Sequence, residues 1–116
     1  MEIENASLSW IDSNLPFSKR FRDIYYSRED ELAESQHIFL KGNKLTARWA
    51  EMTERKSPFT IAEIGFGAGL NFLQTWHLFQ KTQRKPARLH YIGFEKYPLS
   101  FDDLTRVHSR WLSLTK

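Results

Sequence analysis

Three alternating glycines and two acidic residues are the part of this sequence whose types and spacing point to chemistry. The segment Glu63-Ile64-Gly65-Phe66-Gly67-Ala68-Gly69 follows a short apolar, β-branched run, and a helical pattern begins at Leu70. Glycines at a strand-to-helix turn let the backbone approach a bound nucleoside, and amides at the helix start can face its polar groups. Glu95 ends the next predicted strand, where a carboxylate can accept hydrogen bonds from two ribose hydroxyls. The pattern predicts a nucleotide-cofactor site.

Two classes of cofactor compete for such a turn. Dinucleotide sites use G-x-G-x-x-G, but Leu70 stands where the third glycine is needed, and Gly69 comes one residue early. Glu63, two residues before the first glycine, is typical of S-adenosylmethionine sites, where an acid helps to hold the methionine end. We predict adenosylmethionine and keep a dinucleotide as the alternative. The residues assigned to cofactor binding are Glu63, Gly65, Phe66, Gly67, Gly69, Asn71, Glu95 and Lys96.

The elements around this loop predict a parallel sheet. Residues 59–64 are a candidate buried strand, residues 70–83 a helix, and residues 89–94 a second strand. Ser100 and Asp103 resemble a capping box for a last helix over residues 101–112. This order is a βαβα unit, which favours parallel strands with right-handed crossovers. One face of the first helix, predicted to be core, carries Phe72, Leu73, Trp76 and Phe79.

The N-terminal half predicts a small β-structure followed by helices. Residues 6–26 mix polar and aromatic types around the turn at Asp12–Pro16, which favours a β-hairpin or meander. A helix over residues 28–40 would be capped by Ser27 and stopped at Gly42 through access to positive φ. Thr46 would cap a second helix whose apolar side holds Trp49 and Met52.

The fold class is therefore α/β: an N-terminal hairpin with helices, then the first βαβα unit of a Rossmann-like fold with an incomplete parallel sheet. We divide the chain into residues 1–57, the hairpin and helical segment, and residues 58–116, the first half of an adenosylmethionine-binding domain.

Composition bounds the remaining possibilities. The chain has 116 residues, 41% hydrophobic and 27% charged, as expected of one small soluble globular domain. It has no cysteine, which excludes disulfides, zinc–thiolate sites and cysteine nucleophiles, and its four histidines lack the spacing of a metal site. Without a signal peptide or a run long enough to span a bilayer, we expect a cytoplasmic protein with no membrane contact and no metal.

A net charge of +3 is compatible with a nucleic-acid substrate. The run Ser18-Lys19-Arg20-Phe21-Arg22 is a candidate for phosphate contacts, although such runs are more often solvated strand faces. The same interpretation applies to the basic residues around the second loop, Lys81, Arg84, Lys85 and Arg88.

The glycine loop and both of its flanks resemble the methyltransferase half of the MnmC family, bifunctional bacterial enzymes that complete 5-methylaminomethyl-(2-thio)uridine at the tRNA wobble position. Small departures from the family pattern are Tyr26, where Phe is usual, and Ala68, where Thr is common. The resemblance rests on AEIGFGAGLNF at residues 62–72, and on residues 21–27, 34–35, 38–45, 48–49 and 94–99.

The resemblance implies methyl transfer from S-adenosylmethionine to the amine of 5-aminomethyluridine, with the tRNA anticodon loop as partner. Tyr26 and Asn43 become candidates for substrate contact. FAD would belong only to the family's separate oxidase domain, and the carboxylate base is expected beyond residue 116. Two alternatives stay open. One is a truncated, inactive remnant or binding module, whose exposed sheet edge would favour self-association; the other is a fragment of an NAD- or FAD-binding oxidoreductase.

Overall fold

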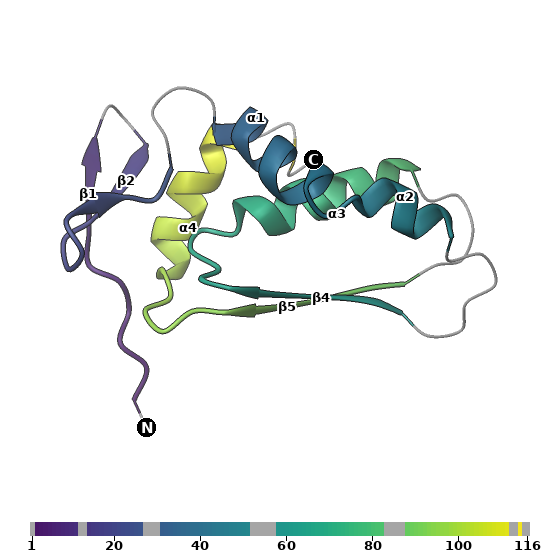
Figure 1. The fold of residues 1–116 in the computed structure, drawn as a ribbon. Coiled ribbons are helices and arrows are strands. Elements are labelled where there is room, and N and C mark those ends of the chain that lie inside the picture. The colour runs from purple at the N-terminus through teal and green to yellow at the C-terminus, as the bar shows by residue number, and fades with distance from the viewer. Residues whose placement is uncertain are drawn as a thin grey trace.

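A computed structural model describes residues 2–11, 14–26, 31–51, 58–82, 88–111 and 114. It contains an antiparallel three-stranded sheet near the N-terminus and a parallel two-stranded sheet further along the chain (Figure 1). Helices cover one face of the parallel sheet, which confirms the predicted mixed α/β fold and is compatible with a partial Rossmann-like unit.

The antiparallel sheet is formed by β1 (Leu8–Ile11), β2 (Leu15–Ser18) and β3 (Asp23–Ile24), in that spatial order. The register pairs Leu8 with Ser18 and Phe17 with Ile24. The predicted hairpin or meander is therefore confirmed. Part of its expected first turn, residues 12 and 13, lies outside the described residues.

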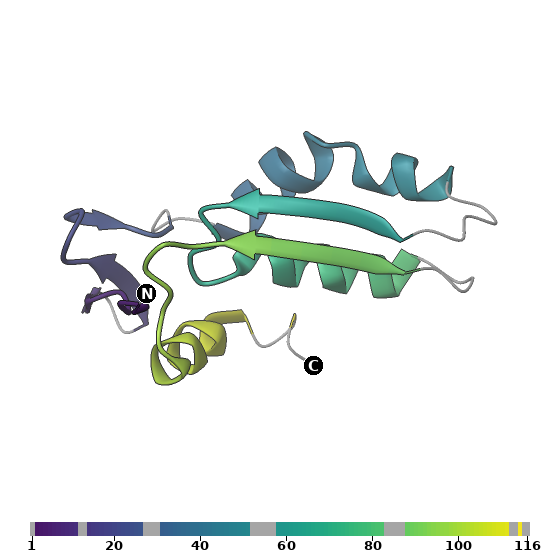
Figure 2. The same cartoon turned by 90° about the horizontal axis from the view of Figure 1, so that it is seen from below.

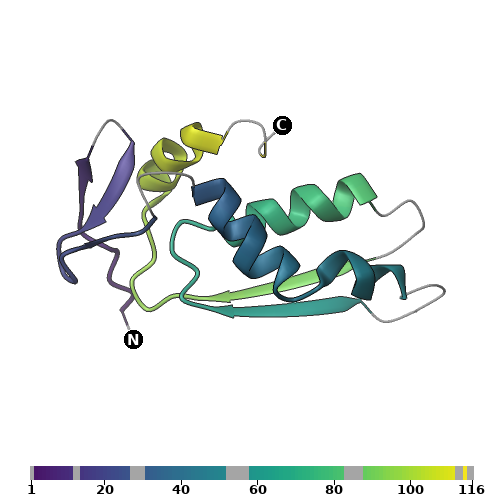
Figure 3. The ribbon, with the colours of Figure 1, turned by 45° about the horizontal axis from the view of Figure 1, so that its top comes forward.

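Three short helical segments follow. They are α1 (Glu31–Ser35), the π-helical η1 (Gln36–Lys41) and α2 (Leu45–Ala50). Both α1 and η1 contact the longer helix of the next unit, along which they lie in Figure 3. The predicted helix over residues 28–40 is present from residue 31 onward, and its expected cap at Ser27 lies outside the described residues.

Two details of this helical region differ from the prediction. Gly42 has φ −59°, so it does not end η1 through positive φ. Glycine is required there by a close approach, since a Cβ at residue 42 would lie 2.2 Å from the carbonyl oxygen of Ile38. The left-handed residue is Lys44, with φ 52°, and α2 starts directly after it. Thr46 therefore lies inside α2 and does not cap it.

The second half is the predicted βαβα unit. Its elements are β4 (Phe59–Ile64), α3 (Leu70–Thr82), β5 (Leu89–Phe94), α4 (Phe101–His108) and the 3₁₀ turn η2 (Ser109–Trp111). The two strands are parallel and in register from the pair Phe59–Leu89 to the pair Ile64–Phe94. Their carboxyl ends therefore lie side by side, where each strand leads into a loop.

The start of α4 follows the predicted cap. The side chain of Ser100 accepts a hydrogen bond of 3.2 Å from the backbone nitrogen of Asp103. α4 ends at His108 and continues as η2, so it is shorter than the predicted helix over residues 101–112. Residue 112 itself lies outside the described residues.

The apolar core forms two clusters that join the two halves of the chain. One contains Leu40, Leu45, Trp49, Phe59 and Phe79; the other contains Ala68, Leu70, Leu73, Leu99, Val107 and Trp111. In the first, the Trp49 ring stands edge-on to both phenylalanines, with centroids 6.2 and 5.1 Å away. Helix α2 is thereby held against β4 and α3.

Trp76 does not lie in the core as predicted. It is 47% exposed, whereas Phe79 on the same helix is buried. Trp76 packs on Phe72 with a centroid separation of 5.6 Å and lines a surface hollow beside β5. Helical periodicity identified the face correctly, but no further described strand lies beyond β5 to cover its outer part.

The other face of the parallel sheet carries no helix among the described residues (Figure 2). Ile64 is 90% exposed there and Phe94 is 54% exposed. In a doubly wound fold helices cover both faces, whereas here the described helices cover one. Within the described ranges, none of the helices has the length and apolar character needed to cross a membrane.

Candidate functional site

The loop between β4 and α3 has the conformation that its glycines allow. Gly65, Gly67 and Gly69 all have positive φ, at 81°, 60° and 83°. A residue with a Cβ pays about 1–2 kcal/mol for this left-handed region, so alternating glycines let the chain reverse direction within a few residues. The loop then enters α3 through a hydrogen bond of 2.9 Å from the Leu73 amide to the Gly69 carbonyl.

The loop is fixed to the end of β5 by backbone and side-chain hydrogen bonds. The amides of Gly65 and Phe66 both donate to the carbonyl of Phe94, at 2.8 and 3.0 Å. Glu95 then accepts from the Gly67 amide through Oε1 at 3.0 Å and from the Tyr97 amide through Oε2 at 3.2 Å. The acid at the tip of β5 thus lies directly against the middle glycine.

The ring of Phe66 fills the space beneath the loop. A Cβ at Gly93 would lie 2.3 Å from Cδ2 of this ring, and a Cβ at Gly69 would lie 2.8 Å from its Cζ. Gly93 is therefore a site residue that the sequence analysis missed. The signal is a glycine in a strand otherwise rich in β-formers, which often marks the close approach of another group.

The peptide group of Ala68 is held from both sides by distant segments. The Tyr26 hydroxyl oxygen accepts a hydrogen bond of 3.2 Å from the Ala68 amide. Nε2 of His108 lies 2.7 Å from the Ala68 carbonyl oxygen, and since that oxygen can only accept, Nε2 carries the proton. Burial raises the pKa of Tyr26 well above its usual value, so this hydroxyl stays protonated. The sequence offers His108 only as one of four histidines without the spacing of a metal site, and it does not predict this contact.

Glu63 is the centre of a network that joins four elements. Its Oε2 accepts from Nδ2 of Asn71 on α3 at 2.6 Å, and its Oε1 accepts from the Tyr91 hydroxyl on β5 at 2.7 Å. The side-chain oxygen Oδ1 of Asn71 in turn accepts from the Ser35 hydroxyl on α1 at 2.5 Å. Burial, then the bond to Glu63, raises the pKa of Tyr91, which keeps it a donor.

Tyr91 and Ser35 were not among the predicted site residues. Tyr91 could have been found from the register, because Gly93 pairs with Glu63 and side chains two residues apart on a strand share a face. Ser35 had no such signal, since its role depends on how α1 packs beside α3.

A cavity of about 370 Å³ opens between this loop and the segment that follows β3. Its wall on the parallel-sheet side includes Glu63, Gly65, Phe66, Gly67, Leu70 and Asn71. The opposite wall includes Ile24, Tyr25, Tyr26, Glu31, Glu34, Ser35, Ile38 and Phe39. The described lining therefore contains carboxylates but no lysine, arginine or histidine.

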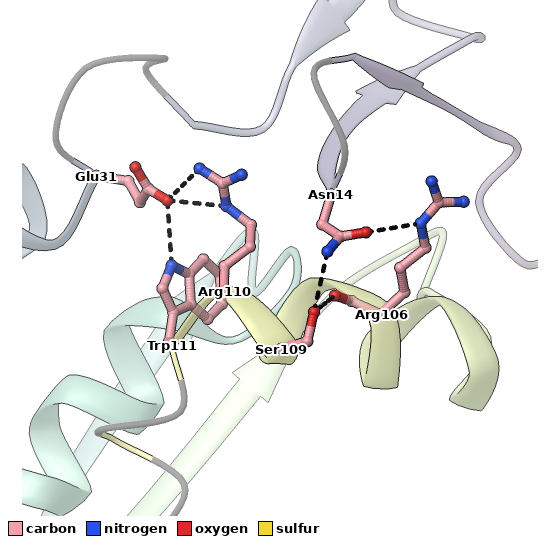
Figure 4. A network of polar contacts seen from close by, with 6 residues as sticks. All are labelled: Asn14, Glu31, Arg106, Ser109, Arg110 and Trp111. Carbon is pink, nitrogen blue, oxygen red and sulfur yellow. Dashed lines mark hydrogen bonds and ion pairs between the residues drawn. The ribbon is translucent and has the colours of Figure 1, made fainter.

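One of these carboxylates is already neutralised. Oε1 of Glu31 accepts from Nε of Arg110 at 2.9 Å, from Nη2 of the same residue at 2.5 Å, and from Nε1 of Trp111 at 3.2 Å (Figure 4). Burial alone would raise the pKa of Glu31, but hydrogen bonds from its own amide, Arg110 and Trp111 outweigh it and lower the pKa. Glu34 and Glu63 remain as the carboxylates facing the cavity without a cationic partner among the described residues.

A second part of the same network ties α4 to the first hairpin. Arg106 Nε donates to Oδ1 of Asn14 at 3.0 Å, and Nδ2 of Asn14 donates to the Ser109 hydroxyl at 3.2 Å (Figure 4). The segment that supplies His108 to the loop is thus held at both ends, by Asn14 on one side and by Glu31 on the other.

The remaining predicted residues lie around this cavity at different distances. Gly69 and Glu95 support the loop without lining the cavity, and Lys96 is exposed, with Nζ 5.5 Å from the Tyr97 ring centroid. Asn43 is separate: it donates to the Phe39 carbonyl at 2.7 Å and lines another hollow of about 210 Å³. The cavity thus unites Tyr26 with the glycine loop but does not include Asn43. In the part of the chain that the structure describes, no cluster of acidic or histidine side chains could hold a metal ion.

Comparison with known proteins gives close relatives over nearly the whole chain. It is 46% identical over 114 residues to a protein of Legionella pneumophila (strain Lens), covering 97% of this chain and 17% of that protein. It is 44% identical over 108 residues to a protein of Saccharophagus degradans, covering 93% and 15%, and 41% identical over 114 residues to one of Marinomonas sp. (strain MWYL1), covering 98% and 17%. All three are named tRNA 5-methylaminomethyl-2-thiouridine biosynthesis bifunctional protein MnmC.

No family model matches the chain. The chain spans about a sixth of the length of these relatives, at 15–17%. At identities of 41–46%, it is homologous to one region of the proteins named MnmC.

Proposed function

We propose that this chain is the cofactor-binding part of an S-adenosylmethionine-dependent methyltransferase that modifies the wobble uridine of tRNA. The observation that carries the proposal is the cavity itself. One side is the loop whose glycines have positive φ, and the lining contains carboxylates without a cationic partner among the described residues. The name shared by the relatives supplies the tRNA substrate, and the resemblance of the loop supplies the methyltransferase role.

The charge of the lining favours adenosylmethionine over a dinucleotide. Adenosylmethionine carries a sulfonium and an ammonium against one carboxylate, so it is cationic overall. A dinucleotide would bring its anionic pyrophosphate to a cavity whose described lining offers Glu34 and Glu63 and no basic side chain. The negative pyrophosphate and these carboxylates would repel each other strongly in a cavity from which water is partly excluded. The size also fits, because ligand cavities commonly measure about 300–1,000 Å³.

The residues present suit the two ends of this cofactor. Glu63 is held by Tyr91 and Asn71 with both oxygens aligned, ready to accept from an ammonium group. A carboxylate offers about four acceptor positions, and Glu95 uses two of them on backbone amides. The remaining positions are open to ribose hydroxyls of a ligand that extends from the cavity to the neighbouring hollow, which Glu95 borders. Bound there, the cofactor would supply an activated methyl group, and the protein would align an uncharged amine with it.

A binding module without turnover is the second candidate. The exposed face of the parallel sheet, with Ile64 at 90%, favours it for the chain taken by itself. Under this reading the chain binds ligand or a partner protein but transfers no methyl group.

Calorimetric titration of the 116-residue chain separates these readings. Adenosylmethionine should bind saturably, NADH should fail to compete, and Glu63→Gln should weaken binding about tenfold or more through loss of the charge-assisted contact. Tighter binding of NADH than of adenosylmethionine would overturn the proposed cofactor. Incorporation of labelled methyl groups into tRNA that lacks the wobble modification then tests turnover, and binding without incorporation would support the module.

A further inference from the structure

The turn between β2 and β3 lies against the segment that carries the acid of the proposed cofactor site. The Arg20 guanidinium carbon is 4.3 Å from the ring centroid of Tyr97, and the Phe21 ring centroid is 6.0 Å from the same ring. Together with Glu95 and Tyr25, these residues border a hollow of about 170 Å³. Tyr25 lines this hollow and the main cavity as well.

The side chains on this turn combine exposed cations with an exposed aromatic ring. Phe21 is 66% exposed, although a ring of that size would normally be buried. Lys19 and Arg22 are exposed and make no ion pair with another residue of the described ranges. Arg20 differs, since its Nη2 lies 3.3 Å from the Glu4 carboxylate, and it serves to hold Tyr97.

The turn presents these side chains from a fixed backbone. The Lys19 amide donates to the Ser7 carbonyl at 3.0 Å, and the Phe21 amide donates to the Ser18 hydroxyl at 3.2 Å. Arg22 has φ 53°, a left-handed conformation that is unfavourable for a residue other than glycine. Such strain persists only where surrounding contacts impose it. The exposed ring therefore has a defined place on the surface.

We infer that Lys19, Phe21 and Arg22, here called the β2–β3 patch, bind single-stranded RNA. A base would stack on Phe21, and flanking phosphates would contact the two cations; stacking and phosphate contact are the means by which proteins hold unpaired nucleotides. A neighbouring nucleotide would then reach the main cavity past Tyr25. The inference rests on the proposed function for the identity of the RNA, an anticodon loop, but its contacts are outside the cofactor cavity.

Fluorescence anisotropy with a labelled anticodon stem–loop RNA, carrying uridine at the wobble position, tests the patch on the full chain. Phe21→Ala should weaken binding about tenfold, because stacking on an aromatic ring contributes about 1–3 kcal/mol per base. The pair Lys19→Gln and Arg22→Asn should lower the slope of log Kd against log salt by about 1–2, since two phosphate contacts are lost. Fully base-paired RNA should compete poorly.

The chain offers a matched control pair. Lys41 and Lys44 are also exposed cations, and Lys44 also has positive φ at 52°. Lys41 ends η1 and Lys44 directly precedes α2, which lies away from the antiparallel sheet in Figure 1. Lys41→Gln with Lys44→Asn removes the same charge and should leave the Kd and the salt slope unchanged. Equal loss in this control, or an unchanged Kd in Phe21→Ala, would overturn the inference.

Adenosylmethionine titration of the same variants separates this inference from the proposed function. The patch variants should retain the cofactor affinity of the parent chain, which also shows that they are folded. A parent chain that binds the cofactor but not the stem–loop would overturn the patch alone. A chain that binds the stem–loop with the expected losses but ignores adenosylmethionine would overturn the proposed cofactor and leave the patch standing.

Discussion

The hydroxyl of Tyr91 on β5 donates a hydrogen bond of 2.7 Å to Oε1 of Glu63 on β4. This contact crosses between the two strands of the parallel sheet at the cavity wall. It leaves Glu63 with both oxygens engaged, the other one by Asn71 at 2.6 Å. The carboxylate that we assign to the methionine end of the cofactor is therefore oriented before any ligand arrives.

Tyr91→Phe should lower adenosylmethionine affinity about three- to tenfold, equivalent to about 0.7–1.4 kcal/mol. The loss should stay below the about 1.5–3 kcal/mol of a hydrogen bond to a charged group, because Asn71 would still hold the other oxygen. The pKa of Tyr91 is raised above its usual value of 10.0, so the hydroxyl donates throughout the range from pH 6 to about 9. The ratio of the adenosylmethionine affinities of the parent chain and Tyr91→Phe should stay constant across that pH range.

Calorimetry over this pH range measures both quantities. Thr105→Val is a suitable control, since it removes a hydroxyl bonded at 2.9 Å to the Phe101 carbonyl on the exposed side of α4. An equal loss of affinity in both variants would contradict a specific role of Tyr91.

The parallel unit could be predicted because its signals are local. The apolar run 59–64, the glycines after it and the capping pair at Ser100 each act within a few residues. Contacts made at long range could not be predicted in the same way. His108 reaches the loop only because α4 is held by Asn14 and Glu31, and both partners are distant in sequence.

Exposure was the other quantity that local patterns could not give. Trp76 lies on the apolar face of α3 but is 47% exposed, since burial depends on what lies beyond β5. Gly42 is the predicted end of a helix because glycine can adopt positive φ. The structure shows that glycine is needed there because the Ile38 carbonyl lies close, and its φ is negative. The roles assigned to the cofactor residues, to Tyr26 and to Asn43 stay predictions.

The Ala68 peptide should depend on both of its side-chain partners. Tyr26→Phe keeps the edge-on contact of the ring with Trp111, at 5.2 Å, and removes only the acceptor of the Ala68 amide. His108→Gln can still donate to the Ala68 carbonyl, whereas His108→Leu cannot. We expect adenosylmethionine affinity to fall about fivefold in Tyr26→Phe and His108→Leu and to recover in His108→Gln, because a hydrogen bond of this kind contributes about 1 kcal/mol.

Titration calorimetry measures these affinities, and thermal unfolding serves as the check on folding. If His108→Gln loses as much affinity as His108→Leu, the hydrogen bond from residue 108 to the Ala68 carbonyl does not position the loop.

Glu31 should stabilise the fold in a pH-dependent way. Its pKa is lowered in the folded state from the usual 4.5, so its contribution is present above pH 4.5 and is lost as the pH falls through the folded-state value. Glu31→Gln should therefore lower the free energy of unfolding by about 1–3 kcal/mol at pH 7. The difference from the parent chain should shrink below pH 4.5.

Urea unfolding at both pH values measures this difference. Glu4→Gln is the matched control, because its ion pair with Arg20 is exposed, with side chains 67% and 49% accessible, and such pairs contribute little. If Glu31→Gln lowers the free energy of unfolding equally at low and neutral pH, the stabilisation does not come from the ionised Glu31 carboxylate.

Gly93 and Gly65 should respond differently to the same added methyl group. A Cβ at Gly65 meets no atom within 4 Å, so Gly65→Ala should cost only the strain of its φ of 81°, about 1–2 kcal/mol. A Cβ at Gly93 would lie 2.3 Å from Cδ2 and 2.9 Å from Cγ of Phe66, too near the base of the ring for a small adjustment. We expect Gly93→Ala to destabilise the chain more than Gly65→Ala and to displace the Phe66 ring.

A double-mutant cycle identifies the cause. Phe66→Ala removes the clashing Cγ and Cδ2 atoms, so Gly93→Ala should cost much less in that background, with a coupling within the range of about 0.5–3 kcal/mol that contacting residues show. Gly65→Ala has no contact to relieve and should be additive with Phe66→Ala. Chemical unfolding of the five variants gives the free energies. Additivity of Gly93→Ala with Phe66→Ala would mean that the ring does not occupy the space against β5, and the site would then have room there for a ligand.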